Sequence, residues 1–512
     1  MGRLVVVSNR VAAAEDAARA GGLSVALRAA LKAGPALWFG WSGERTPAFS
    51  GELSTHRVDD IDVVTIDLED ADFEAYYNGY ANATLWPLFH SRTDLAAYDR
   101  SFREGYARVN RRFAAALAPL LRPDDLVWVH DYHLIPLGRE LRRLGVANSI
   151  GFFLHIPWPA PQLFTTLPEH ADLAEAMFAY DLVGFQTEAC VDAFADYVTR
   201  EARGRREGDR LAAFGGSTLA GAFPIGIDTP EFLRLVRSQA AERAWDRMAA
   251  HGAFRSLIVG VDRLDYSKGL PERLLGFEHF LQAHPDMVRK VLYLQVAPSS
   301  REGVEAYQTL RLEVLALAGR INATWAEMDH APMLCVNRNY GRAELAGIYR
   351  AARVGLVTPL RDGMNLVAKE YVAAQDPDDP GVLVLSRFAG AAEQMTDALI
   401  VNPYAPEELA DAIGAALEMP RHERVRRWMR LMAGVERFDV RTWRDTFVAA
   451  LAGARDRRAP EAERPVMATL AQDEPVGEDP FSVLDDEGEA AGLTRGRGSV
   501  AEGRGWRSLG QG

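Results

Sequence analysis

Short apolar runs alternate with stretches of helical hydrophobic spacing along most of the chain. The runs show little alternation with polar residues, which is typical of parallel strands that helices cover on both faces. Strands are predicted at residues 4–7, 63–66, 126–129, 150–154, 182–185, 256–261, 291–296, 333–336, 354–357 and 382–385, and helices at 24–32, 113–121 and 274–282. This alternation predicts an α/β protein with two doubly wound, Rossmann-like domains.

The series of predicted strands is interrupted between Ile227 and Ser256. Pro230 and an arginine-rich helical stretch at 234–248 occupy this gap. Because a long interruption in a strand series indicates a change of domain, we place the boundary near Asp228.

The expected N-terminal domain covers residues 1–228, and the second domain covers residues 229–439. A last helix is predicted at about 440–455, where two aromatic anchors have helical spacing, and we expect it to pack back on the first domain. Residues 456–512 are rich in Pro, Gly, Asp, Glu and Arg and poor in apolar side chains, so an acidic, disordered tail is predicted there.

Composition and charge narrow the classes of function. The 512 residues are 48% hydrophobic and 25% charged, as in a soluble globular protein, and the net charge of −13 argues against a nucleic-acid partner. The two cysteines, Cys190 and Cys335, lie far apart, which fits a reducing cytoplasm. The apolar run at 4–7 is too short for a signal peptide or a membrane helix. We therefore expect a cytoplasmic protein without a membrane partner.

The segment from Arg361 to Glu370 carries the most specific chemistry. It follows a predicted strand, contains Gly363 in a tight turn, and leads into a predicted helix. Several main-chain N–H groups at such a helix start can bind a negatively charged or hydroxyl-rich ligand. One turn further, Glu370 can accept hydrogen bonds from a ribose diol. The segment indicates half of a sugar-nucleotide site.

A second charged segment, from Asp262 to Gly269, also follows a predicted strand. Open α/β sheets place their ligands at the carboxyl ends of strands, where Arg263 and Lys268 can converge on a diphosphate. The alternative is an ordinary surface ion pair between Arg263 and Asp265. The glycine turn at Gly363, on another strand end of the same domain, favours the ligand site.

Polar side chains also follow strands of the first domain. Arg10 comes just after the first strand, and Asp131 and His155 follow two others. His130, Asp131 and His133 are acceptable metal ligands, but their spacing matches no standard zinc pattern, so we favour hydrogen bonding of Asp131 to sugar hydroxyls. No dinucleotide fingerprint or P-loop accompanies the Gly21-Gly22 pair.

Aromatic residues cluster at 76–78 and 85–87. Core packing is the expected role of Tyr76, whereas a loop-borne Trp86 can shape a sugar pocket. Asp60-Ile61-Asp62 has the form of a metal-binding D-x-D motif, but it precedes a predicted strand, and we treat it as chance.

Together these segments resemble the trehalose-6-phosphate synthases, a family of retaining glycosyltransferases with the GT-B fold. The resemblance covers about residues 1–450. It is carried by residues 7–10, 21–23, 38–43, 76–78, 85–87, 130–134, 151–159, 224–227, 263–273, 301, 319–322, 355–375 and 382–403.

The resemblance implies transfer of glucose from UDP-glucose to the anomeric hydroxyl of glucose 6-phosphate, giving α,α-trehalose 6-phosphate and UDP. It implies that glucose 6-phosphate is held by Arg10, Tyr77, Asp131 and Arg301. It implies that UDP-glucose is held by Gly22, Leu23, Arg263, Lys268, Tyr340, Asp362, Gly363, Met364, Asn365, Leu366, Val367, Ala368, Lys369 and Glu370. Some members of the family carry phenylalanine where this chain has Tyr340.

The resemblance also implies that Trp86 and Ile156 enforce the α anomer, and that His155 and Asp362 contact the donor glucose. His155, Arg263, Lys268 and Asp362 are the expected catalytic residues. Since Arg263 and Lys268 can stabilise the departing UDP, we expect no metal ion and no cofactor. No carboxylate stands out as a nucleophile, which favours attack on the same face that the leaving group departs from.

Two other functions remain open at this point. One is a related GT-B transferase with another acceptor, such as free glucose, although Arg10 and Arg301 favour a phosphorylated one. The other is a catalytically silent sugar-nucleotide sensor. We also expect a homo-oligomer, either a dimer or a tetramer.

Overall fold

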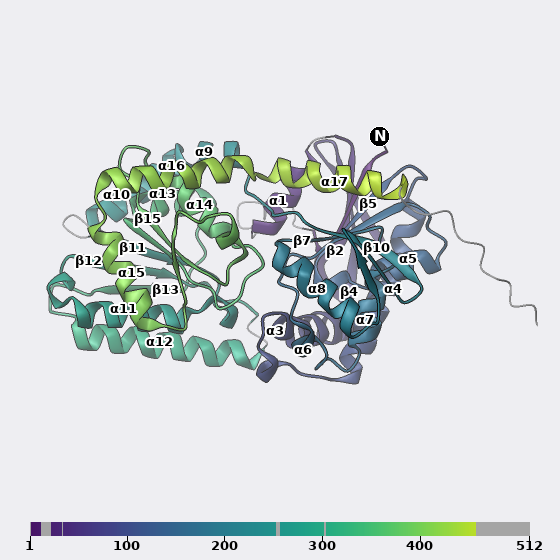
Figure 1. Ribbon diagram of the computed structural model, residues 1–512, viewed down its shortest axis with the longest axis horizontal. Coiled ribbons are helices and arrows are strands. Elements are labelled where there is room, and N and C mark those ends of the chain that lie inside the picture. The colour runs from purple at the N-terminus through teal and green to yellow at the C-terminus, as the bar shows by residue number, and fades with distance from the viewer. Residues whose placement is uncertain (1, 12–21, 33, 252–255, 302–303, 457–512) are drawn as a thin grey trace, which may run out of the picture. The chain divides into compact units, whose positions relative to one another are not determined.

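The computed structural model describes residues 2–11, 22–32, 34–251, 256–301 and 304–456, which belong to one compact unit (Figure 1). The expectation of a disordered tail falls on residues 457–512, outside the described residues. Two β-sheets with helices on their faces make up the unit. The doubly wound α/β prediction is confirmed.

The first sheet has the strand order β3-β4-β2-β1-β5-β6-β7-β10-β9-β8. Its strands are β1 (Leu4–Arg10), β2 (Ala36–Thr46), β3 (Leu53–Val58), β4 (Ile61–Glu69), β5 (Leu126–His130), β6 (Ser149–Phe153), β7 (Leu182–Phe185), β8 (Arg205–Glu207), β9 (Arg210–Ala213) and β10 (Gly216–Ala222). The run from β4 to β10 is parallel, and β3, β9 and β8 extend it antiparallel at the edges.

The helices around the first sheet include one unusually wide element. They are α1 (Gly22–Leu31), α2 (Asp70–Asp72), the π-helix η2 (Phe73–Leu85), α3 (Trp86–Phe89), η3 (Thr93–Leu95), α4 (Arg100–Leu117), η4 (Ala118–Leu120), η5 (Tyr132–Leu134), α5 (Leu137–Arg143), α6 (Pro161–Phe164), α7 (His170–Met177) and α8 (Glu188–Arg200). A π-helix longer than one turn is rare, and such elements often occur at functional sites.

The second sheet is parallel throughout, in the order β13-β12-β11-β14-β15-β16. Its strands are β11 (Ser256–Val261), β12 (Val291–Val296), β13 (Met333–Val336), β14 (Val354–Val357), β15 (Val382–Ser386) and β16 (Leu399–Val401). Its helices are α9 (Thr229–Val236), α10 (Gln239–His251), η6 (Tyr266–Lys268), α11 (Leu270–Ala283), η7 (Pro285–Met287), α12 (Glu305–Trp325), α13 (Arg342–Ala351), α14 (Leu366–Ala374), η8 (Gly390–Glu393), α15 (Pro406–Glu418) and α16 (Arg421–Arg437).

The central strands of both sheets are buried on both faces, which explains their unbroken apolar runs. Val5 of β1, for example, lies between Leu37 of β2 and Val127 of β5, and none of the three side chains is exposed by more than 3%. Val259 of β11 lies in the same way between Leu294 and Gly355 of the second sheet. Covered parallel sheets of this kind direct their ligand sites to the strand ends.

The last helix, α17 (Val440–Asp456), packs on the first sheet and lies beside α1 (Figure 1). The Phe447 ring stacks on Trp128, with ring centroids 4.5 Å apart. Room for this ring comes from Gly151 and Gly184 on neighbouring strands, where an added Cβ would lie 2.8 and 2.7 Å from it. The chain therefore returns from the second sheet to the first before it leaves the described region.

The sequence pattern was wrong about the helix at 234–248. Two helices, α9 and α10, meet at this point, because the Ser238 hydroxyl accepts a hydrogen bond from Ala241 N at 3.3 Å and caps a new helix. The pattern also missed β3, whose side chains are almost all exposed at the edge of the sheet and carry no apolar run.

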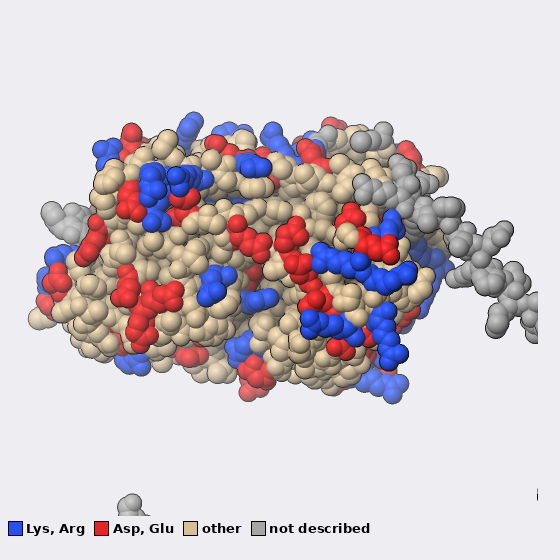
Figure 2. All heavy atoms as spheres, viewed as in Figure 1, with Lys and Arg blue, Asp and Glu red and all other residues tan. Residues whose placement is uncertain are grey.

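Charges of both signs are interspersed over the face of the molecule in Figure 2, and neither sign forms a continuous field there. Among the described residues, no helix is both long and apolar enough to cross a membrane.

Candidate functional site

Each sheet reverses its strand order at a central strand. In the first sheet β1 lies between β2 and β5, and in the second β11 lies between β12 and β14. Ligands of open α/β sheets bind outside the carboxyl ends of strands at such reversals. Arg10 ends β1, Asp131 follows β5, and Arg263 follows β11. The predicted site residues therefore lie where this architecture places ligands.

The aromatic ring of Trp41 contacts both Arg10 and Tyr77. The Arg10 guanidinium carbon lies 5.8 Å from the centre of the Trp41 ring, and Trp41 lies 5.7 Å from Tyr77. Tyr77 also stacks on His133, with centroids 5.9 Å apart and an interplanar angle of 13°. Arg10 itself is exposed, so its charge is available to a ligand.

The wide helix η2 brings Tyr77 and Trp86 into the site. Tyr77 lies inside η2, while Trp86 begins α3 directly after it, so the expectation of a loop-borne Trp86 was wrong. Tyr76 is fully buried, as expected for core packing, and donates a hydrogen bond to Asn9 Oδ1 at 2.7 Å. Successive residues of the helix thus serve the core and the site.

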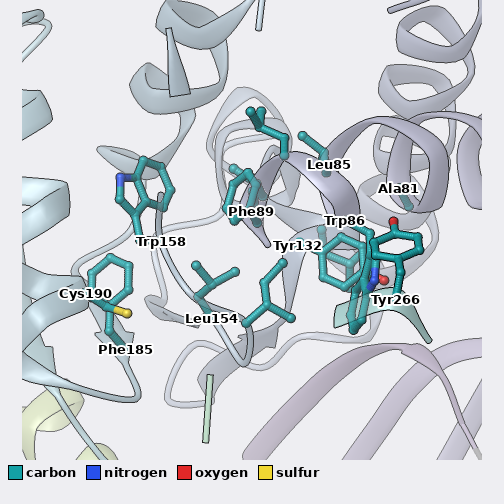
Figure 3. Close-up of a cluster of buried hydrophobic side chains, with 14 of the residues drawn as sticks. Ala81, Leu85, Trp86, Phe89, Tyr132, Leu154, Trp158, Phe185, Cys190 and Tyr266 are labelled. Carbon is teal, nitrogen blue, oxygen red and sulfur yellow. The ribbon is translucent and has the colours of Figure 1, made fainter. Parts of the chain in front are cut away.

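Trp86 is only 6% exposed and contacts both the imidazole ring of His90 and the guanidinium of Arg301. The His90 ring is 4.1 Å away on one side, and the guanidinium carbon of Arg301 lies 3.8 Å from the Trp86 ring centre. Figure 3 shows Trp86 beside Tyr132, whose ring centroid is 5.6 Å away. Ile156, the other residue expected to select the anomer, is also 6% exposed.

Asp131 is held in a strained conformation next to His155. Its φ angle of +75° is uncommon outside glycine, and its Oδ1 accepts a hydrogen bond from His155 N at 3.2 Å. Burial raises the pKa of Asp131 to about 7, although main-chain hydrogen bonds and the charge of Arg301 oppose the shift. Burial lowers the pKa of His155 to about 3, so its imidazole is neutral near pH 7.

No metal-ligand set is formed by the neighbouring residues His130, Asp131 and His133. His130 Nδ1 lies 3.1 Å from His155 Nε2, so this nitrogen is already engaged. His133 stacks with Tyr77 instead of facing His130. Among the described residues, no group of three or more His, Cys, Asp and Glu side chains is arranged as metal ligands.

Asp265, a fully buried residue, links the two sheets. Its Oδ1 accepts from Ser267 N at 3.0 Å and from Trp86 Nε1 at 3.4 Å. Its Oδ2 accepts from Tyr307 OH at 3.2 Å and lies 3.4 Å from Arg301 Nη1. One carboxylate therefore fixes both members of the Arg301–Trp86 stack.

The charge of Asp265 is stabilised by three cations. Burial by itself would raise its pKa, but Arg301, Arg263 and Lys268 outweigh the burial and lower the pKa to about 2. The alternative of an ordinary Arg263–Asp265 surface pair is wrong, because Asp265 is buried and Arg263 is exposed.

Lys268 and Asp362 approach each other from different strand ends. Lys268 Nζ donates to Asp362 Oδ2 at 2.5 Å, and Asn365 Nδ2 donates to the same oxygen at 3.1 Å. Asn365 has a φ angle of +82°, and its side chain accepts from Ala368 N, which caps α14. Asn365, Asp131 and Arg301 all have positive φ angles, and such strain is typical of functional sites.

Gly363 is needed for a close approach and not for a turn. The positive φ angle of this segment is at Asn365, whereas a Cβ added to Gly363 would lie 2.0 Å from the carbonyl oxygen of His155. The same Cβ would lie 3.1 Å from the Cα of Ile156. The backbone that precedes α14 thus rests directly on the backbone that follows β6 of the first sheet.

Two neighbouring charged residues of helix α14, Lys369 and Glu370, differ in burial and in partners. Glu370 is half-buried, and burial raises its pKa to about 7 while Arg342 opposes the shift. Lys369 is 1% exposed, and its Nζ donates to Ile225 O and Gln394 Oε1, each at 2.8 Å. The side chain of Lys369 therefore binds protein oxygens, whereas the sequence analysis expected this residue to hold UDP-glucose.

The remaining residues that were expected to bind UDP-glucose differ in their burial. Met364 and Ala368 are buried, Leu366 and Val367 are half-buried, and Tyr340 is half-buried before α13 with Arg338 stacked on its ring at 5.6 Å. Gly22 and Leu23 begin α1, but their side-chain surroundings fall outside the described residues.

Sequence reasoning gave no role in the site to Gln186, His90, Tyr132 and Tyr307. It considered His130 only as a metal ligand and Asp265 only as a surface partner of Arg263, whereas both are buried among site residues. Asp265 was visible as an acidic residue after a strand, but its burial was not. Tyr132 accepts from Arg301 Nη2 at 3.2 Å, and Tyr307 lies 2.5 Å from Arg301 Nη1. Nothing in the sequence indicates that these two tyrosines, 175 positions apart, face one arginine.

The sequence model described as glycosyltransferase family 20 matches residues 4–453. The chain belongs to glycosyltransferase family 20. A relative from Sinorhizobium fredii, named trehalose-6-phosphate synthase, is 48% identical over 466 residues, which cover 89% of this chain and 100% of the relative. Membership of this family makes the chain a glycosyltransferase.

Solved structures of similar proteins agree in fold. An α,α-trehalose-phosphate synthase (UDP-forming) from Burkholderia xenovorans, in complex with glucose 6-phosphate, is 47% identical with a TM-score of 0.85, and the match covers 88% of this chain and 100% of that one. A protein from E. coli bound with UDP-2-fluoro glucose is 45% identical with a TM-score of 0.84, over 88% of this chain and 99% of that one. The GT-B prediction is confirmed.

Proposed function

We propose that the chain transfers glucose from UDP-glucose to glucose 6-phosphate and forms α,α-trehalose 6-phosphate and UDP. The observation that carries this proposal is the position of Arg301. This cation comes from the second half of the chain, stacks on Trp86, and lies close enough to Asp131 to oppose the rise in the pKa of that carboxyl. The relatives named as trehalose-6-phosphate synthases support the same reaction.

In this proposal Arg10 and Arg301 hold the phosphate of glucose 6-phosphate, and Tyr77 and Asp131 bind its remaining polar groups. A planar guanidinium suits phosphate because it donates two parallel hydrogen bonds. Since Arg10 belongs to the first sheet and Arg301 follows a strand of the second, a shared phosphate favours closure of the two halves. Trp86 and Ile156 restrict the acceptor to the α anomer.

UDP-glucose binds along α14, with its ribose on Glu370 and its glucose near His155 and Asp362. Arg263 and Lys268 stabilise the negative charge that develops on UDP, a contribution of about 3–4 kcal/mol for a well-placed donor. Lys268 reaches the diphosphate from its position beside Asp362. Because two cations serve the leaving group, the proposed reaction needs no metal ion and no cofactor.

The proposed reaction retains the configuration at the anomeric carbon. The anomeric oxygen of glucose 6-phosphate bonds to C1 of the donor glucose as the bond from C1 to the UDP oxygen breaks. The proton of the attacking hydroxyl passes to a phosphate oxygen of the departing UDP. Asp362 does not act as a nucleophile in this scheme, since Lys268 and Asn365 both bind its Oδ2.

Release of UDP tests the reaction. The purified chain is incubated with UDP-glucose in EDTA, with glucose 6-phosphate, with free glucose or with no acceptor. UDP release that depends on glucose 6-phosphate is expected. Equal release with free glucose would favour the transferase with another acceptor, absence of release would favour the silent sensor, and loss of activity in EDTA would contradict the metal-free scheme.

We also propose a cytoplasmic homo-oligomer, a dimer or a tetramer, that binds neither nucleic acid nor membrane. The homo-oligomer is supported by Leu312 and Leu315, which are 69% and 48% exposed one turn apart on α12. Light scattering during size-exclusion chromatography measures the mass directly. A single species at the chain mass of 56.4 kDa would contradict the oligomer.

A further inference from the structure

Gln186 directly follows β7 and is only 2% exposed. Its Oε1 accepts a hydrogen bond from Ile225 N at 3.0 Å, and its Nε2 lies 3.4 Å from His155 Nδ1. A main-chain N–H can only donate, so the oxygen of the Gln186 amide must face Ile225. The amide nitrogen, which is a donor, must then face His155.

This orientation fixes the protonation of two histidine rings. Since the Gln186 amide donates to Nδ1 of His155, the His155 proton resides on Nε2. That nitrogen lies 3.1 Å from His130 Nδ1, which must accept. His130 then carries its proton on Nε2, a buried atom for which no partner occurs among the described residues. Burial lowers the pKa of both histidines, so both rings stay neutral.

The same chain of hydrogen bonds continues to helix α14. Ile225 donates its N–H to Gln186, and its carbonyl oxygen accepts from Lys369 Nζ at 2.8 Å. Ile225 belongs to the segment that connects the two sheets. At the next residue the fit is tight, because a Cβ added to Gly226 would lie 1.9 Å from Phe438 O on the returning chain. Gln186 thus binds the segment that connects the two sheets.

We propose that Gln186 is a positioning residue for the donor sugar: it holds His155 as the Nε2–H tautomer and, through Ile225 and Lys369, aligns that ring with helix α14. The role rests on the proposed function, in which His155 contacts the glucosyl group of UDP-glucose. Lys369 has a buried side chain, and its part in donor binding is to connect α14 with Ile225. With Nδ1 of His155 on Gln186 and Nε2–H on His130, the neutral ring is held in one fixed orientation.

The Gln186→Glu variant tests the tautomer while it keeps the anchor to Ile225. A glutamate oxygen still accepts from Ile225 N, but the other oxygen now attracts a proton to Nδ1 of His155. We expect kcat/KM for UDP-glucose to fall about tenfold or more, because the changed tautomer places two acceptor nitrogens of His155 and His130 against each other and displaces the ring at the reacting sugar. The affinity for UDP alone, measured by calorimetry, stays unchanged, since UDP lacks the glucosyl group.

A spectroscopic readout follows the proton itself. In protein with ¹⁵N-labelled histidine, the His155 signals, assigned by their loss in His155→Asn, are expected to show an unprotonated Nδ1 in the wild type between pH 6 and 8. In Gln186→Glu they are expected to show a protonated Nδ1. Unchanged signals in the variant would overturn the proposal. This measurement needs no catalysis, so it remains decisive if the proposed reaction fails in the wild type.

Gln186→Met and Gln375→Met form a matched pair that separates positioning from packing. Gln375 is another buried glutamine whose Oε1 accepts from a main-chain N–H, at 2.8 Å from Gly381 N, but it lies away from His155. Both variants are expected to lower Tm, and only Gln186→Met is expected to lower kcat/KM. An equal effect on kcat/KM in the two variants would overturn the proposal.

Discussion

The guanidinium of Arg301 stacks on Trp86, with 3.8 Å between its central carbon and the ring centre. Both partners are bound to the same buried carboxylate of Asp265, at 3.4 Å in each case. Because Trp86 belongs to the first half of the chain and Arg301 to the second, this contact exists only when the two halves meet. In the proposed function, acceptor binding and contact between the two halves therefore depend on the same three side chains.

Replacement of Arg301 by alanine should weaken acceptor binding far more than donor binding. A hydrogen bond to a charged group is worth about 1.5–3 kcal/mol, so KM for glucose 6-phosphate should rise about 10- to 100-fold. KM for UDP-glucose should change little. Arg301→Lys keeps the charge but loses the planar fork, and an intermediate effect is expected. Equal increases in both KM values, from steady-state kinetics, would contradict the acceptor assignment.

A methyl group at Gly363 should prevent the two backbones from meeting. In Gly363→Ala the new Cβ would collide with His155 O, which is main chain and cannot move aside. We expect kcat to fall about 100-fold, since a displacement of about 1 Å at the reacting groups is enough for such a loss. Gly319→Ala on the exposed face of α12 is the control, because nothing lies within 4 Å of its new Cβ. Wild-type kcat in Gly363→Ala would disprove the contact.

Much of the fold followed from the sequence because both sheets bury their central strands on both faces. The apolar runs at β5, β7, β11, β12 and β14 are visible without any tertiary information. The edge strand β3 and the hairpin strands β8 and β9 have exposed or mixed side chains, and their pairing depends on a neighbouring strand. The wide helix η2 has no recognised sequence pattern at all.

The candidate site was predictable as a set of strand ends but not as a network. Arg10, Asp131 and Arg263 could be found because each comes directly after an apolar run. Gly363 was expected to serve a turn, whereas its lack of a side chain is required by a backbone from the other sheet. Gln186 was missed because its role depends on His155, 31 positions earlier, and a contact at that separation leaves no local pattern.

Neutralising Asp265 should destabilise the folded chain. In Asp265→Asn the buried cation of Arg301 loses its carboxylate, and breaking a buried ion pair in this way costs about 3–5 kcal/mol. Since the pKa of Asp265 is lowered to about 2, its stabilising contribution is complete above about pH 4 and is lost as pH falls towards 2. The difference in Tm between variant and wild type should therefore be large at pH 7 and shrink below pH 4.

Asp286→Asn provides the control for this prediction. Asp286 pairs with Lys290 at 2.9 Å, but both side chains are exposed, and such a surface pair is expected to contribute no measurable change in Tm. If the two variants had the same Tm at pH 7, Asp265 would not be the buried counter-charge that its contacts indicate.

Binding of UDP should release protons near pH 7, because Glu370 is partly protonated before the nucleotide arrives. Burial raises its pKa to about 7, and hydroxyl groups of a bound ribose would donate to the carboxylate and favour its charged form. Calorimetry of UDP binding in phosphate and in Tris should therefore give different apparent enthalpies, and the difference should disappear in Glu370→Gln. Equal binding enthalpies of the wild type in the two buffers would show that Glu370 does not change its protonation when UDP binds.

The raised pKa of Glu370 also affects the stability of the folded chain. The stabilising contribution of the glutamate is present below about pH 4.5 and is lost as pH rises through 7. Glu370→Gln should therefore gain in Tm relative to wild type at pH 8 compared with pH 5.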